Sequence, residues 1–145
     1  MSYNIEQANS GYMALTAGGL TYGSTVNTKL KTANTVTFVN NGILKSYTTA
    51  EVAFTAGHTS LAANQSCLFA LWLTGAGVAS TTQGPIVAAG DPCPVPTQDT
   101  ANTTLIGLLK ISSTVAFVPN TTALNGVSGV TYTFYDTALM PGTAQ

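Results

Sequence analysis

The chain has 145 residues, of which only 6% are charged, and four lysines against five acidic residues leave a net charge of -1. Ordinary globular proteins carry about 25% charged residues. Nucleic acids and anionic membranes are bound through clustered Lys and Arg, so this composition excludes the first partner and disfavours the second. Because 45% of the residues are hydrophobic, we expect a folded chain with one domain, residues 1–145.

The first strong structural signals follow residues 1–23, which we expect to be an N-terminal arm that orders on a partner. Thr35–Val39 and Ile43–Tyr47 have strand composition, and Asn41-Gly42 stands between them. Asn-Gly is a strong hairpin signal because both residues tolerate positive φ. This stretch therefore predicts a two-stranded hairpin.

Ser66–Thr74 is apolar on both faces, which is typical of a central strand that is covered on both sides. Val130–Tyr135 alternates, so Val130, Tyr132 and Phe134 are expected on one face of a strand. Helical periodicity is weak throughout the chain. The remaining predicted strands are Glu51–Thr55, Pro85–Ala88, Leu105–Ser112 and Val115–Val118.

Residues 84–99 contain four prolines and predict a long crossover loop. Short strands separated by Gly, Asn, Pro and Ser predict an all-β fold, an antiparallel β-sandwich or barrel. Residues 33–74 and 101–137 also resemble each other: Val52-Ala53-Phe54 recurs as Val115-Ala116-Phe117. Either the likeness is chance in a Thr-rich chain, or two Greek-key halves build a jelly roll.

Residues that carry chemistry are scarce. His58 is the only histidine, and no G-x-S-x-G pattern accompanies it, so we expect a loop residue without a catalytic role. Cys67 and Cys93 are too few for structural zinc and are expected to be free thiols. Gly75-Ala76-Gly77 lacks the third glycine of a dinucleotide loop and predicts a turn at a strand end.

Two further patterns have ordinary explanations. Asp91 and Asp99 flank the proline-rich loop and could meet as glycosidase carboxylates do, but nothing else marks a sugar cleft. Asn64, Asn102 and Asn120 each begin an Asn-x-Ser/Thr triplet, which we interpret as turn chemistry. We therefore expect no catalytic, cofactor-binding or metal-binding residues, no cofactor and no enzyme activity.

The chain resembles the head cement, or decoration, proteins of tailed bacteriophages, most closely the jelly-roll type of short-tailed phages. The resemblance covers a short arm (Ser2–Asn9), charge-poor strands, the segment Asn64–Gly77 and the closing Val130–Gly142. It implies a structural protein that binds the outside of the capsid lattice and cements adjacent subunits. The implied partners are the major capsid protein and the chain itself, as a homodimer or homotrimer.

The start of the chain has neither the basic nor the apolar segment of a signal peptide, so we expect synthesis in the host cytoplasm and a final place in the virion. A glycan- or receptor-binding module of a phage fibre or baseplate is the alternative function. It would use aromatic residues as a platform, whereas the competing interpretation places them in the core or at its edge. The candidates are Tyr12, Tyr22, Tyr47, Trp72, Tyr132 and Tyr135.

Overall fold

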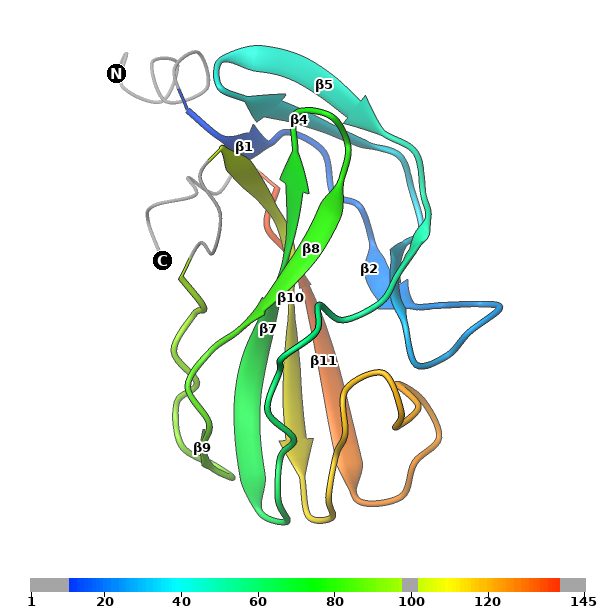
Figure 1. Cartoon of the computed structure of the whole chain (residues 1–145), viewed down its shortest axis with the longest axis vertical. Coiled ribbons are helices and arrows are strands. Elements are labelled where there is room, and N and C mark those ends of the chain that lie inside the picture. The colour runs from blue at the N-terminus through cyan, green and yellow to red at the C-terminus, as the bar shows by residue number, and fades with distance from the viewer. Residues whose placement is uncertain (1–10, 98–101, 139–145) are drawn as a thin grey trace.

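The computed structural model describes residues 11–97 and 102–138, which form eleven strands and no helix. All strand pairs are antiparallel, so the all-β prediction is confirmed and the arrangement is consistent with a β-sandwich (Figure 1). The strands are β1 (Met13–Ala14), β2 (Leu20–Tyr22), β3 (Leu30–Thr32), β4 (Val36–Asn40), β5 (Ile43–Tyr47), β6 (Glu51–Val52), β7 (Gln65–Thr74), β8 (Ala79–Gln83), β9 (Val87–Ala88), β10 (Thr103–Ser113) and β11 (Val130–Asp136).

The largest sheet has the strand order β11-β10-β7-β8, and β9 also pairs with β7. Its long strands β7 and β10 pair along their whole length, from Gln65 opposite Ser113 to Thr74 opposite Thr103. Ser66 through Leu73 are all buried, which confirms the predicted central strand covered on both faces. The sheet thus consists of two hairpins joined by the β7–β10 pair.

A bulge in β10 lets β2 approach this sheet closely. The register shifts between Leu105 and Gly107. A Cβ atom at Gly107 would lie 2.9 Å from Leu20 Cδ2 and 3.1 Å from the Tyr135 carbonyl oxygen. Only glycine leaves room for this contact without a displacement.

Two three-stranded sheets, β1-β4-β5 and β2-β3-β6, contribute to the same core as the large sheet. The predicted turn between β4 and β5 is confirmed, since Asn41 has φ 50° and Gly42 has φ 74°. Two residues with positive φ give the turn whose twist matches a hairpin.

The main hydrophobic core centres on three phenylalanines that come from separate parts of the chain. The Phe69 ring on β7 lies 4.9 Å from the Phe54 ring and 6.4 Å from the Phe117 ring, measured between centroids. Val130, Tyr132 and Phe134 pack against this core from one face of β11, as the alternation predicted. The loops before β7 and after β10 therefore close the core together with the small sheets.

A second apolar cluster covers the opposite face of the large sheet. It contains Leu68, Ala70, Trp72, Leu105 and Leu108, with Cys93 and Val95 packed against it. The proline-rich loop supplies this cover.

The described part of that loop packs against residues of β7 and β10. Gly84 is tight there because a Cβ atom would stand 2.7 Å from the Pro94 carbonyl oxygen. Only Val87–Ala88 of the predicted strand Pro85–Ala88 forms a strand, while residues 98 and 99 lie outside the described residues.

Uncharged side chains hold the backbone of the connection between β6 and β7. Asn120 accepts a hydrogen bond from the Phe54 N–H and donates one to the Phe54 carbonyl, both at 2.8 Å. Gln83 makes the same reciprocal pair with Thr59, at 2.7 and 2.8 Å. These bonds replace the strand pairing that the Glu51–Thr55 prediction expected, so β6 ends at Val52.

The predicted strand Val115–Val118 is also absent. Phe117 forms a single bridge with Leu61, with hydrogen bonds of 2.9 Å in both directions. Thr122 Oγ1 then accepts a hydrogen bond from the Val118 N–H, so the chain turns away instead of continuing the ladder. The side chain of Phe117 is buried, which is why the pattern looked like a strand.

The N-terminal stretch is part of the folded body from Met13 onward. Met13 and Ala14 pair with β4, and Leu20 on β2 is buried. The Asp136 carboxylate accepts hydrogen bonds from the N–H groups of Gly19 and Leu20. The expected arm of residues 1–23 is therefore wrong for this portion, because its apolar side chains are needed in the core, and residues 1–10 lie outside the described residues.

The internal repeat stays a prediction. Phe54 and Phe117 are both buried against Phe69, in agreement with equivalent positions. The offset that aligns Val52 with Val115 also aligns β5 with part of β10, and these two strands pair differently, since β5 pairs with β4 whereas β10 pairs with β7 and β11.

Truncation of the central phenylalanine tests this account of the core. We expect Phe69→Ala to lower the free energy of unfolding by about 3–5 kcal/mol, because the ring contacts two others and is fully buried. Val78→Ala is the control and should change it by less than about 0.5 kcal/mol, since Val78 is exposed. Urea unfolding measures both, and equal effects would contradict the assignment.

Glu51 gives a pH-dependent prediction for the loop between β2 and β3. Its carboxylate accepts hydrogen bonds from the Thr25 N–H at 2.6 Å and the Val26 N–H at 3.2 Å. The Thr25 bond, and next the Val26 bond and nearby lysines, hold the pKa of Glu51 below its usual value. The stabilisation is therefore present above the unfolded-state pKa and lost as the pH falls through the folded-state pKa.

We accordingly expect Glu51→Gln to lower the melting temperature at pH 7, and the difference from the unchanged protein to shrink towards zero at acid pH. Thermal unfolding at a series of pH values measures this. A difference that stays constant down to pH 2 would show that the charge of Glu51 does not stabilise the loop.

Candidate interaction surface

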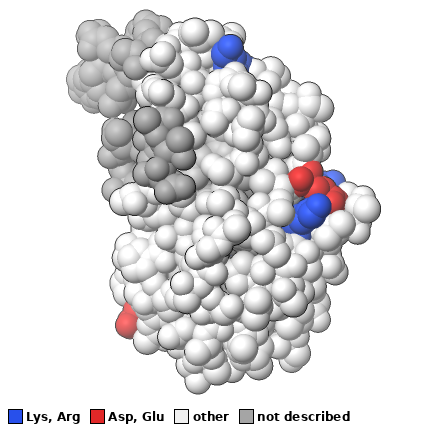
Figure 2. Space-filling view, viewed as in Figure 1, with Lys and Arg blue, Asp and Glu red and all other residues white. Residues whose placement is uncertain are grey.

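The surface carries very few charges. Figure 2 shows one face of the molecule on which acidic and basic groups are scattered and most atoms belong to uncharged residues. Glu51 and its neighbours Lys29 and Lys31 form one small group at the edge of this face. Between these scattered charges, this face offers uncharged groups to a partner.

Three large apolar side chains are exposed at one end of the fold, and we call them the apolar tip. They are Ile43 and Leu44 on β5, which are 56% and 63% exposed, and Val78 in the β7–β8 turn, which is 61% exposed. The two turns are neighbours, because a Cβ atom at Gly75 would lie 2.9 Å from Asn40 Oδ1 (Figure 1).

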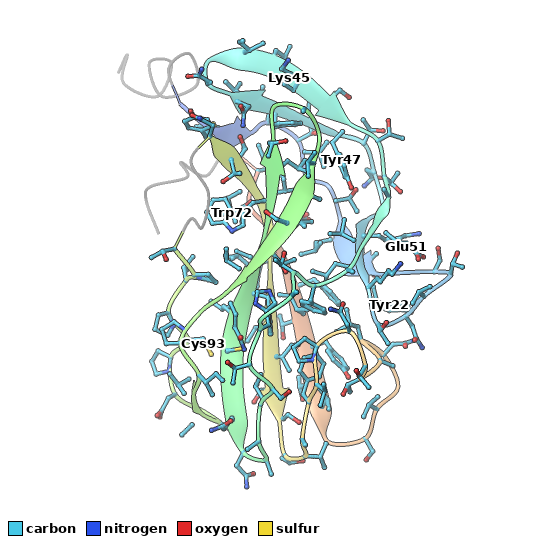
Figure 3. All side chains as sticks on the ribbon, viewed as in Figure 1. Tyr22, Lys45, Tyr47, Glu51, Trp72 and Cys93 are labelled. Atoms are coloured by element: carbon cyan, nitrogen blue, oxygen red, sulfur yellow. The ribbon has the colours of Figure 1, made fainter. Side chains whose placement is uncertain are left out.

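Buried polar bonds fix the tip to the large sheet. Asn40 Nδ2 at the end of β4 donates to the Asn102 carbonyl oxygen at 2.8 Å and reaches Thr104 Oγ1 at 3.3 Å. The Thr104 hydroxyl in turn donates to the Val39 carbonyl at 2.9 Å. The hairpin that carries Ile43 and Leu44 is therefore held on β10 and has a defined position. Lys45 projects at the same end (Figure 3).

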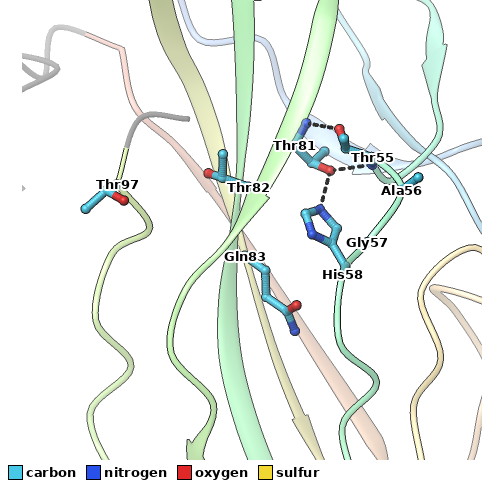
Figure 4. Close-up of a pocket in the computed structure, with 8 residues that line it drawn as sticks. All are labelled: Thr55, Ala56, Gly57, His58, Thr81, Thr82, Gln83 and Thr97. Atoms are coloured by element: carbon cyan, nitrogen blue, oxygen red, sulfur yellow. Dashed lines mark hydrogen bonds between the residues drawn. The ribbon is translucent and has the colours of Figure 1, made fainter. Parts of the chain in front are cut away.

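His58 lines a polar hollow of about 390 Å³ (Figure 4). Its Nε2 lies 2.8 Å from Thr81 Oγ1, which also accepts the Thr55 N–H at 2.8 Å. The other lining residues are Ala56, Gly57, Thr82, Gln83 and Thr97. His58 is the titratable residue among the described residues of this lining.

The two cysteines are free thiols, as predicted. Cys67 is fully buried on β7, and this burial raises the pKa of its thiol to about 11. Cys93 is half-buried in the proline-rich loop. Among the residues that the structure describes, no three His, Cys, Asp or Glu side chains come together as a metal site.

The predicted turns are confirmed by backbone geometry. Asn64, Asn102 and Asn120, which begin the three Asn-x-Ser/Thr triplets, have φ of 62°, 64° and 64°. Gly77 has φ 79° in the turn between β7 and β8, so the Gly75-Ala76-Gly77 segment ends a strand. Asp91 is exposed, and Asp99 lies outside the described residues.

The aromatic residues considered for a glycan-binding platform differ in their burial. Tyr47 and Trp72 are buried, and the Trp72 Nε1 donates to Thr82 Oγ1 at 2.7 Å (Figure 3). Tyr132 donates its hydroxyl to the Ala123 carbonyl, and Tyr12 donates to Asn102 Oδ1 at 2.6 Å. The exposed ones are Tyr22 on β2 and Tyr135 on β11.

Comparison of the chain with protein-family models, curated proteins and solved structures found no match. The described residues contain no helix long and apolar enough to cross a bilayer.

The apolar tip is the feature that the sequence analysis missed. A signal was present, because Ile43 and Leu44 are consecutive and follow the Asn-Gly turn directly. Neighbouring residues of a strand point to opposite faces, so a strand covered on one face exposes one of the two. At this end of the hairpin, both faces of β5 are exposed to solvent.

The thiols give a direct test of the described burial. We expect a maleimide reagent at pH 8 to label one thiol per native chain, Cys93, because Cys67 is buried and its pKa is about 11. Mass spectrometry of the intact protein and its peptides measures this. Unfolding in urea should expose the second site, and rapid labelling of native Cys67 would contradict the core described above.

Proposed function

We propose that this protein is a structural virion protein that binds the outside of a phage capsid and cements adjacent major capsid subunits. The observation that carries the proposal is a nearly uncharged exterior with a fixed apolar tip at one end. A surface with so few charges is poorly protected against association, so we infer that neighbours cover it in the working state.

The chemistry of this surface suits a lattice. Thr, Ser and Asn provide hydrogen bonds and lose less rotamer entropy on contact than Lys or Glu. The individual contacts are weak, but attachment to several capsid subunits at once multiplies modest affinities. Self-association as a homodimer or homotrimer belongs to the same proposal.

We infer a jelly roll built from two Greek-key halves, in keeping with the resemblance to cement proteins of short-tailed phages. The shared core of three antiparallel sheets supports a two-layered β fold.

The binding surface gives a quantitative test on expanded heads that lack this protein. We expect occupancy to change less than about twofold between 50 mM and 500 mM NaCl, because contacts between uncharged groups are not screened. Co-sedimentation of added protein with the heads measures occupancy. A steep loss with salt would contradict the proposal, and so would absence of the protein from purified virions by mass spectrometry.

The tip provides the variant and its control. We expect Ile43→Ser with Leu44→Ser to weaken binding to heads by about tenfold, because two exposed apolar side chains lose their burial at the interface. The double change should leave the melting temperature of the free protein nearly unchanged. Lys29→Gln is the matched control outside the tip. Equal binding by the unchanged protein, the double variant and the control would exclude the tip from the interface.

A further inference from the structure

Most strand edges in the described residues are short, charged or covered. In β8, the Thr81 N–H donates to Thr55 Oγ1 at 2.9 Å, so the neighbouring loop covers part of this edge. Strand β5 carries Lys45, and a charged side chain discourages edge pairing. The edges of β1, β2, β6 and β9 are two or three residues long.

Strand β11 lacks these protections. It forms the border of the largest sheet over Val130–Asp136, with neither Lys nor Pro. Its acidic residue, Asp136, is engaged with the Gly19 and Leu20 N–H groups at the end of the strand. Thr131 is exposed, and Tyr135 is 45% exposed. An uncharged edge of this length is a template for another strand.

The residue pattern of β11 fits a second copy of itself. Two such strands, antiparallel about Thr133, would place Tyr132 opposite the Phe134 of the other copy and Thr131 opposite its Tyr135. Aromatic pairs and Thr–Thr pairs are favourable across antiparallel strands. The one charge, Asp136, would face Val130, so this register brings no like charges together. Tyr132 and Phe134 are only partly buried in one chain, and pairing would cover them further.

We propose that two copies of this chain pair through their β11 strands, antiparallel about Thr133, and join their largest sheets into one continuous sheet. The contact is isologous, as a two-fold dimer requires. This contact is the surface for the self-association that is included in the proposed function. The contact forms without a capsid.

The first test places a charge on the two-fold axis. We expect the full chain to be a dimer by sedimentation equilibrium, and Thr133→Glu to raise the dissociation constant at least about tenfold, because two carboxylates then face each other. The monomer should tolerate this change, since Thr133 is opposite Lys110 on β10. Ser46→Glu on β5 is the matched control and should leave the dimer intact, while circular dichroism checks the fold of both variants.

The second test locates the contact. In a Cys93→Ser background, Thr133→Cys should be crosslinked between copies by a short bis-maleimide, whereas Ser46→Cys should not. A monomer at 100 μM, a trimer, or a dimer that ignores Thr133→Glu and fails to crosslink at position 133 would overturn the proposal. Because these measurements use the purified chain, such a failure leaves binding to heads to be decided by the occupancy experiment.

Discussion

The connection between β6 and β7 depends on hydrogen bonds from uncharged side chains to its backbone. Asn120 and Gln83 each pair with both polar groups of one residue in this connection, and the hydroxyls of Thr55 and Thr81 each accept the other residue's N–H. A buried backbone group without a partner destabilises a fold, so these bonds let the loop close over the Phe69 core. This connection satisfies its irregular backbone with amides and hydroxyls, whereas the backbone at Gly19 and at Thr25 is bound by the carboxylates of Asp136 and Glu51.

The same preference for uncharged polar side chains determines the surface of the protein. A chain that uses Thr, Ser and Asn for polarity has little electrostatic repulsion between copies and presents hydroxyls and alkyl groups to its surroundings. The apolar tip is held in place by Asn40 and Thr104. The tip and the β11 edge lie on different elements of the fold, so one can bind a foreign surface while the other pairs with a second copy.

Sequence patterns predicted the parts of the fold whose signals are local. The Asn41-Gly42 turn, the faces of Val130–Tyr135 and the left-handed asparagines all follow from one residue or a short alternation. Val115–Val118 was misjudged because a buried Phe117 looks the same in a strand and in a loop that fills a core. The burial of Met13 and Leu20 and the exposure of the tip depend on packing between distant segments, which no local pattern contains.

Electron cryomicroscopy of the assembled phage head, at a resolution that places side chains, tests the central claim most directly. The account predicts density for this protein on the outside of the shell, with its interfaces formed by uncharged residues and the apolar tip buried against capsid protein. The group of Glu51, Lys29 and Lys31 should lie away from those interfaces. An interface centred on that charged group, or heads without this protein, would contradict the account.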